Sequence, residues 1–298
     1  MFELLSPYHQ FQLSSLLITL LMVLSVSMLF EAGIFSLAVG GVVAIGGYGA
    51  GLLSTRSEMP LMVGLVAPPV LAALVSLLLG MAILRLRGIY LALGTFAFAQ
   101  LVVIVIANWS FAGAVDGIVG IGPGLSVWSL LGVVVVICTL MELVRRSRFG
   151  RATRAIRLDE RTAAGVGVDA RRYRLVLFTI AGALAAFAGA CDAHLVGVVS
   201  SDQYGFSLLV TVFAFALIGG TGHWLGPVAA TICFTLFRQS FGYSGSGWEQ
   251  VGYGAALVVI MLVAPNGLSD PSLWRRLRSA AGGPGRRRVA ASSVGGTR

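Results

Sequence analysis

Long apolar segments constrain this chain more than any other feature of its sequence. A helix needs about 20 mainly apolar residues to cross the roughly 30 Å of hydrocarbon in a bilayer. Nine candidate spans can be recognised, at 12–30, 34–53, 61–84, 88–107, 125–143, 174–198, 207–219, 224–240 and 249–264. Hydrophobic residues are 57% of the chain and charged residues only 11%, which excludes an ordinary soluble enzyme, a disordered protein and a nucleic-acid-binding module. The pattern predicts an all-α, polytopic membrane helix bundle.

The pair of segments 207–219 and 224–240 leaves two interpretations open. The first segment is short, and the glycine-rich stretch 218–222 interrupts the apolar run. The pair is either one broken helix or two short helices.

The arginines predict how the helices are oriented. All 21 basic residues are arginines, and nine alternating spans with the N-terminus outside put 19 of them on one side. These are Arg85, Arg87, the ten from Arg145 to Arg174, and seven in the C-terminal tail; only Arg56 and Arg238 fall outside. Because cytoplasmic loops carry excess positive charge, we expect a multi-pass membrane protein with a cytoplasmic C-terminus. With eight spans, the arginine-rich tail and the loop from Arg145 to Arg174 would lie on opposite sides of the membrane.

The domain organisation follows from the same pattern. We expect a transmembrane domain over 1–268, with one large cytoplasmic loop at 144–173, and a tail over 269–298. The tail is rich in arginine and glycine and lacks apolar periodicity, so we expect it to be disordered and to meet anionic lipid or a specific partner. The first ten residues lack a basic region, so no cleavable signal peptide is expected.

Missing residue types limit the chemistry. Without lysine there is no P-loop and no Schiff-base lysine. The three cysteines are widely spaced in apolar runs, and the three histidines do not cluster with carboxylates. We therefore expect no enzyme, no metal and no cofactor bound by this chain.

Charged residues inside the spans are few, and such residues are functional candidates by default. Glu142 has Arg145 and Arg146 three and four residues on, a spacing that predicts an interfacial ion pair. Asp192 and His194 lie towards the outer end of their span. They either occupy a hydrated position near the outer headgroups or belong to a substrate pathway. So few intramembrane acids argue against a secondary carrier driven by ions.

Small residues are concentrated in two spans. Segment 40–51 includes Gly46, Gly47 and Gly51, and small residues recur every four positions from Ala181 to Ala190. Such spacing lets helix backbones approach closely. Tight packing is one interpretation of segment 40–51; a translocation pathway lined by freed backbone groups is the other.

The loop after the fifth candidate span is the most distinctive segment. Its arginines recur every three or four residues and predict one basic helical face. They are Arg148, Arg151, Arg154, Arg157 and Arg161. Acidic and small residues follow them. The segment either lies on anionic lipid or offers a helix to a cytoplasmic motor protein.

These segments together resemble the LivM-type permease of bacterial branched-chain amino-acid ABC transporters. The similarity runs from about residue 28 to 268 and is carried by residues 86–123, 146–169, 181–206, 218–230 and 261–268. The most characteristic stretches in these segments are LRGIYLALGTFAFAQ, RSRFGRATRAIRLDERTAAGVGVD and IGGTGHWLGP.

The resemblance implies a permease subunit of an ATP-binding-cassette importer. Its implied partners are a second permease of the LivH type, two cytoplasmic ATPase subunits that use the ATP, and a periplasmic substrate-binding protein. Residues 146–169 would dock on the ATPase. The expected coupling residues are Arg148, Gly150, Arg151, Arg154, Arg157, Glu160, Ala163, Ala164 and Gly167, and the pathway candidates are Gly46, Gly47, Gly51, Gln100, Asp192 and His194.

Departures from the family pattern keep the solute open. Gln100 stands where the family commonly has a glutamate, and residues 35–40 lack a glutamine that is common there. Branched-chain or similar amino acids are the first expectation, with urea, short amides or a sugar as the alternative. A stand-alone secondary carrier or channel is the alternative from a different class.

Overall fold

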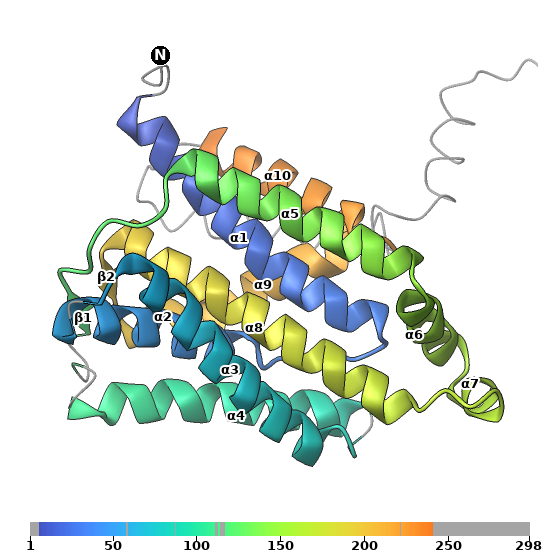
Figure 1. Ribbon diagram of the computed structural model, residues 1–298. Helices are drawn as coiled ribbons and strands as arrows, with labels where there is room; N and C mark the ends of the chain where they lie inside the picture. The colour runs from blue at the N-terminus through green and yellow to red at the C-terminus, as the bar shows by residue number, and fades with distance from the viewer. Residues whose placement is uncertain are drawn as a thin grey trace, which may run out of the picture.

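The computed structural model describes residues 6–57, 59–86, 88–110, 113, 117–220 and 222–240. Figure 1 shows these residues as a bundle of long helices. The predicted span 249–264, the similar stretch 261–268 and the tail 269–298 lie outside the described residues.

A helix overlaps each of the eight predicted spans that fall in this part of the chain. They are α1 (Pro7–Glu31), α2 (Val39–Arg56), α3 (Leu61–Ile83), α4 (Ile89–Asn108), α5 (Val127–Arg146), α8 (Ala170–Val196), α9 (Phe206–Gly219) and α10 (Leu225–Ser240). Six helical segments of the described chain are long and apolar enough to cross a membrane: α1, α3, α4, α5, α8, and α9 together with the short 3-10 helix η3 (Ser201–Tyr204) before it. The all-α prediction is confirmed, apart from a two-stranded antiparallel ribbon of β1 (Ile118–Val119) and β2 (Val198–Val199).

The α1–α2 connection is longer than the sequence predicted. A span was expected from residue 34, but α2 begins at Val39. Gly33 takes a positive φ of 69°, which glycine adopts without steric cost. The backbone N–H of Leu37 donates to the Thr95 hydroxyl of α4 at 2.9 Å, so this extended connection is fixed to a neighbouring helix instead of continuing α2.

The glycine-rich interruption separates two helices, which settles the choice between one broken and two short helices. Gly220 has a positive φ of 88° at the end of α9. A Cβ on Gly219 would lie 2.2 Å from Pro227 of α10, so glycine is required where the two helices meet. α9 and α10 then pack against each other.

α1 and α8 form the centre of the bundle (Figure 1). α1 contacts α5, α8, α9 and α10, while α8 also contacts α2 and α3. A Cβ on Gly189 of α8 would lie 2.2 Å from the Val43 carbonyl oxygen of α2, and a Cβ on Gly182 would lie 2.0 Å from the Ser76 hydroxyl of α3. The small residues of α8 therefore allow α2 and α3 to pack closely against it. Such close approach increases the dispersion interactions that hold membrane helices together.

The connections fall at two opposite ends of the bundle. The α6 end holds α6 (Arg148–Leu158), α7 (Glu160–Gly165), the α1–α2 connection and the α9–α10 loop. The hairpin end holds β1 and β2, where the backbone N–H of Gly122 donates to the Ser54 hydroxyl at the end of α2. Arg85 and the arginines from Arg145 to Arg174 lie at the α6 end, and Arg56 lies at the hairpin end.

Candidate coupling site

Two short helices outside the bundle make up the predicted coupling segment. Ser147 caps α6 by accepting the Gly150 N–H at 3.4 Å, and Asp159 caps α7 by accepting the Arg161 N–H at 2.9 Å. The Thr162 hydroxyl also donates to Asp159. These hydrogen bonds, with that of Thr162 the largest cause, hold the pKa of the Asp159 carboxyl below its ordinary value. The amphipathic helix expected here is present, divided into two by Asp159.

The two faces of α6 differ in composition. Gly150, Thr153 and Ile156 are buried and recur every three residues on the inner face. A Cβ on Gly150 would lie 2.4 Å from the Val144 carbonyl oxygen, so glycine is needed where α6 folds back on α5. The predicted arginines of α6 are all exposed: Arg148, Arg151, Arg154 and Arg157.

The remaining predicted coupling residues divide between the inside and the outside of this segment. Ala163 is buried, whereas Ala164 and Gly167 are exposed. Glu160 accepts a hydrogen bond from Arg174 of α8 at 3.2 Å. Gly167 has a positive φ of 83°, and the space where its side chain would be is open. The inward residues shape the segment, and the outward ones are available to a partner.

Glu142 joins two parts of the α6 end. Its carboxylate accepts hydrogen bonds from the Arg145 side chain at 2.9 and 3.0 Å and from Arg146 Nε at 2.6 Å, which confirms the predicted ion pair. It also accepts from Trp224 Nε1 at 3.0 Å, 82 positions along the chain. Glu142 thus connects the end of α5, one turn before α6, to the loop between α9 and α10.

Glu31 adds an acidic group beneath α6. Its Oε1 atom is buried and has no hydrogen-bond partner among the residues that the structure describes. Arg145, Arg154 and Arg157 are the cations that act on it electrostatically. Two residues further on, the position of a Gly33 Cβ lies 3.6 Å from Arg157 Cγ. The arginines of α6 therefore face the end of α1 as well as solvent.

His223 lies beside the same cluster. Its Nε2 is 4.0 Å from Glu142 Oε2, and its Nδ1 accepts the Leu225 N–H at 3.2 Å. Partial burial, followed by repulsion from Arg145, lowers the pKa of His223 below 6.5, while Glu142 opposes that shift. Sequence reasoning missed His223, Trp224 and Glu31 as members of this cluster.

The glycine candidates for a pathway pack against neighbouring helices. A Cβ on Gly46 would lie 2.0 Å from the Ala186 carbonyl oxygen, and one on Gly47 would lie 2.3 Å from the Tyr204 hydroxyl. Gly51 faces Ile118 and Ile121 at the hairpin end. Gln100 is half-buried on α4, next to Ala99, which contacts Gly41 of α2. Of the two interpretations of segment 40–51, these contacts favour tight packing.

Asp192 and His194 face different neighbours. Asp192 is half-buried and interacts with Tyr204 of η3. His194 is buried, and its Nδ1 lies 2.9 Å from the Gly122 carbonyl oxygen. The hydrated position considered for His194 is therefore wrong, because the connection before α5 covers it. Among the described residues, no group of three His, Cys, Asp or Glu side chains could hold a metal ion.

The apolar helices, with a basic helical segment outside them at one end, define a multi-pass membrane protein. The model of the family described as the permease component of branched-chain amino acid transport systems matches residues 10–264. The chain belongs to this family, and its similarity to LivM agrees with the LivM-type resemblance of the sequence.

Individual relatives agree with this assignment. The high-affinity branched-chain amino acid permease LivM of Escherichia coli K12 is 28% identical over 272 aligned residues, which cover 80% of this chain and 64% of LivM. LivH of the same organism is 30% identical over 130 residues, covering 43% of this chain and 42% of LivH. A probable ABC transporter permease of E. coli, YphD, is 28% identical over 141 residues, covering 45% and 42%. This chain thus spans less than two thirds of LivM. No solved structure matches it.

Proposed function

We propose that this chain is one of two permease subunits of an ATP-binding-cassette importer that moves branched-chain or similar amino acids across the bacterial inner membrane. The family match over residues 10–264 carries the proposal. Similarity to both LivM and LivH supports a heterodimeric pair with a LivH-type permease. Two ATPase subunits and a periplasmic binding protein complete the assembly.

In this proposal, α6 and α7 dock on an ATPase subunit. The two most exposed large apolar side chains of the described chain lie here, Leu158 at 88% and Val166 at 76%. These two residues lie outside the helices that qualify as spans, so in this proposal a partner protein covers them. The arginines around them would pair with acidic groups of the partner.

Movement of the docked segment would reach the bundle through Glu142 and Glu31. Glu142 connects α5 to the α9–α10 loop, and Arg157 contacts the α1–α2 connection beside Glu31. Closure of the ATPase pair would displace α6, and the rigid contacts would shift the ends of α1, α5, α9 and α10 together. Such rigid-body shifts are the usual basis of alternating access.

Orientation follows from the same arrangement. The α6 end carries Arg85 and the ten arginines from Arg145 to Arg174, so in this proposal it faces the cytoplasm. The hairpin end then faces the periplasm and the binding protein.

Reconstitution with defined partners tests the proposal. The chain, a LivH-type permease, both ATPases and one binding protein are placed in proteoliposomes, and uptake of radiolabelled leucine and urea is measured separately. We expect leucine uptake that requires every partner. Uptake by the permeases without an ATPase would establish a secondary carrier or channel and contradict the importer; uptake of urea but not leucine would contradict the amino-acid assignment alone.

A further inference from the structure

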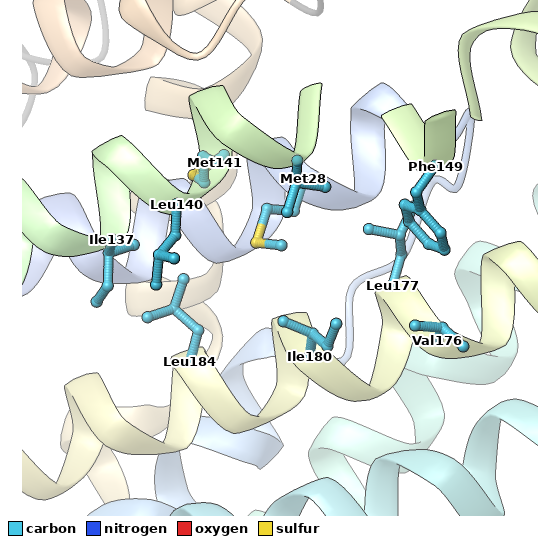
Figure 2. Close-up of a pocket in the computed structure, with 10 residues that line it drawn as sticks. Met28, Ile137, Leu140, Met141, Phe149, Val176, Leu177, Ile180 and Leu184 are labelled. Atoms are coloured by element: carbon cyan, nitrogen blue, oxygen red, sulfur yellow. The ribbon is translucent and has the colours of Figure 1, made fainter. Parts of the chain in front are cut away.

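An open apolar groove of about 380 Å³ lies between α5 and α8, with α1 beneath it (Figure 2). All ten residues that line it are apolar: Met28, Ile137, Leu140, Met141, Val144, Phe149, Val176, Leu177, Ile180 and Leu184. Leu140, Val144, Val176 and Ile180 remain between 40% and 53% exposed. The groove is therefore accessible from the side of the bundle.

The side of the groove formed by α8 is nearly as long as the hydrocarbon part of one membrane leaflet is thick. Val176, Ile180 and Leu184 recur every four residues and so share one helix face. They span about 12 Å at 1.5 Å per residue, against roughly 15 Å for half of the hydrocarbon core. Arg172 precedes Val176 by four residues on the same face, about 6 Å further on. An acyl chain along this face would place its headgroup at the level of Arg172.

The end of the groove near α6 is closed by an aromatic pair and carries positive charge. The rings of Phe149 and Tyr173 lie 4.8 Å apart between α6 and α8. Arg148 and Arg172, both exposed, directly precede these two aromatic residues. The Nε atom of Arg172 pairs with Asp169 at 3.0 Å, and a guanidinium has five N–H donors, so Arg172 retains donors for a phosphate.

The side chains that line the groove suit a lipid better than another helix. Interfaces between membrane helices are enriched in glycine, alanine, serine and threonine, and none of these lines the groove. On α8 such residues lie on another face, where Gly182 and Gly189 pack against α3 and α2. The groove-facing residues are bulky aliphatic side chains, methionines and one phenylalanine, which give an acyl chain an apolar surface along its length.

We propose that this groove binds one anionic phospholipid, with an acyl chain between α5 and α8 and the phosphate at Arg172 and Arg148. Basic positions between membrane helices on the cytoplasmic side are known to take anionic headgroups. This lipid site does not depend on which solute is carried. A negative result for lipid binding would therefore leave the proposed function untouched.

Retention of lipid by the full chain tests the site. Wild type and variants are purified in detergent, exchanged into mixed micelles of phosphatidylglycerol and phosphatidylcholine, washed, and assayed for bound lipid by quantitative mass spectrometry. We expect about one retained phosphatidylglycerol per chain, in preference to phosphatidylcholine. Arg172→Gln should weaken phosphatidylglycerol binding by about tenfold, the scale of one charge-assisted contact, and Ile180→Trp should abolish retention of both lipids by filling the groove.

Matched controls separate the groove from general effects. Arg171→Gln removes the adjacent charge, and Leu74→Trp places the same bulk on α3, where Leu74 is 54% exposed; both should retain lipid as wild type does. Equal retention of the two lipids in wild type, or unchanged retention in Ile180→Trp, would overturn the proposal. A photoreactive side chain at position 180 in native membranes should give a lipid adduct, and an adduct with a second permease chain would instead show that the groove is a helix interface.

Discussion

At the scale of single residues, Glu142 connects the coupling segment to the bundle. Its oxygens accept hydrogen bonds from two arginines of α5 and from Trp224 in the α9–α10 loop. The arginines are sequence neighbours, and the carboxylate would stay paired without Trp224. The Trp224 contact is therefore the part of this arrangement that bears on communication between elements.

Loss of the Trp224 N–H should uncouple these elements. Trp224→Phe keeps an aromatic ring and removes the donor, so we expect ATP-driven uptake to fall several-fold while the amount of inserted protein is unchanged. Glu142 is the acceptor of this contact, and alanine removes the acceptor, so Glu142→Ala combined with Trp224→Phe should be no worse than Glu142→Ala alone. Trp128→Phe, on the exposed side of α5, is the control. If the losses of uptake in the two single variants simply add in the double variant, the Glu142–Trp224 contact does not contribute to transport.

Acidification should weaken the α6 end through His223. Its folded-state pKa lies below 6.5, so the unfolded chain takes up the proton first as the pH falls. The contribution of His223 to stability is therefore complete above about pH 7.5, decreases as the pH falls through 6.5, and levels off below the folded-state pKa. Melting temperatures measured between about pH 7.5 and 5.5 should decline more in wild type than in His223→Gln. Parallel curves for the two proteins would contradict this assignment.

At the scale of elements, the sequence predicted which segments become helices because apolar length determines membrane spans. The ion pair of Glu142 with Arg145 and Arg146 was also predictable, since helix periodicity brings residues three and four apart together. The partner Trp224 was not, because its contact depends on how α9 and α10 pack on α1 and α5. The sequence did contain one cue: His223 and Trp224 directly follow the glycine-rich stretch at the end of a span.

The late start of α2 at Val39 and the β1–β2 ribbon had no clear signal in the sequence. Residues 34–38 are mainly apolar, and in the structure the Gly33 turn and the Leu37–Thr95 hydrogen bond hold them outside α2. Two-residue strands are too short to show periodicity. The sequence also could not show whether Gly46 and Gly47 pack against other helices or line a pathway. Only the fold places them against α8 and η3.

Close packing of α2 on α8 should make Gly46 intolerant of any side chain. Gly46→Ala places a methyl group 2.0 Å from the Ala186 carbonyl oxygen, so we expect a loss of about 1–3 kcal/mol in stability and a lower melting temperature. Gly132→Ala is the matched control, because a Cβ there meets open space on α5, and it should be neutral or stabilising by up to about 1 kcal/mol. Equal melting temperatures for the two variants would refute the packing account of Gly46.

The coupling segment should respond to bulk and charge at Gly167. Gly167→Arg should abolish co-purification of the ATPase subunit while membrane insertion stays normal. Its positive φ of 83° strains most side chains, so Gly167→Asn, which tolerates that conformation, is the control and should retain the ATPase. Normal ATPase binding by the Gly167→Arg variant would place the docking surface elsewhere.

At the scale of the whole molecule, the distribution of arginine gives the bundle its polarity. The same residues that predict the orientation of the chain also form the outer surface of α6. One set of side chains would thus hold that end of the bundle in the cytoplasm and present a basic surface to an ATPase.

The most direct test of this account is the initial rate of leucine uptake by the reconstituted assembly, with ATP or a non-hydrolysable analogue supplied on the ATPase side. We expect leucine to accumulate against its gradient with ATP and not with the analogue. Equal uptake in the two conditions would show that transport does not depend on ATP hydrolysis and would contradict the account.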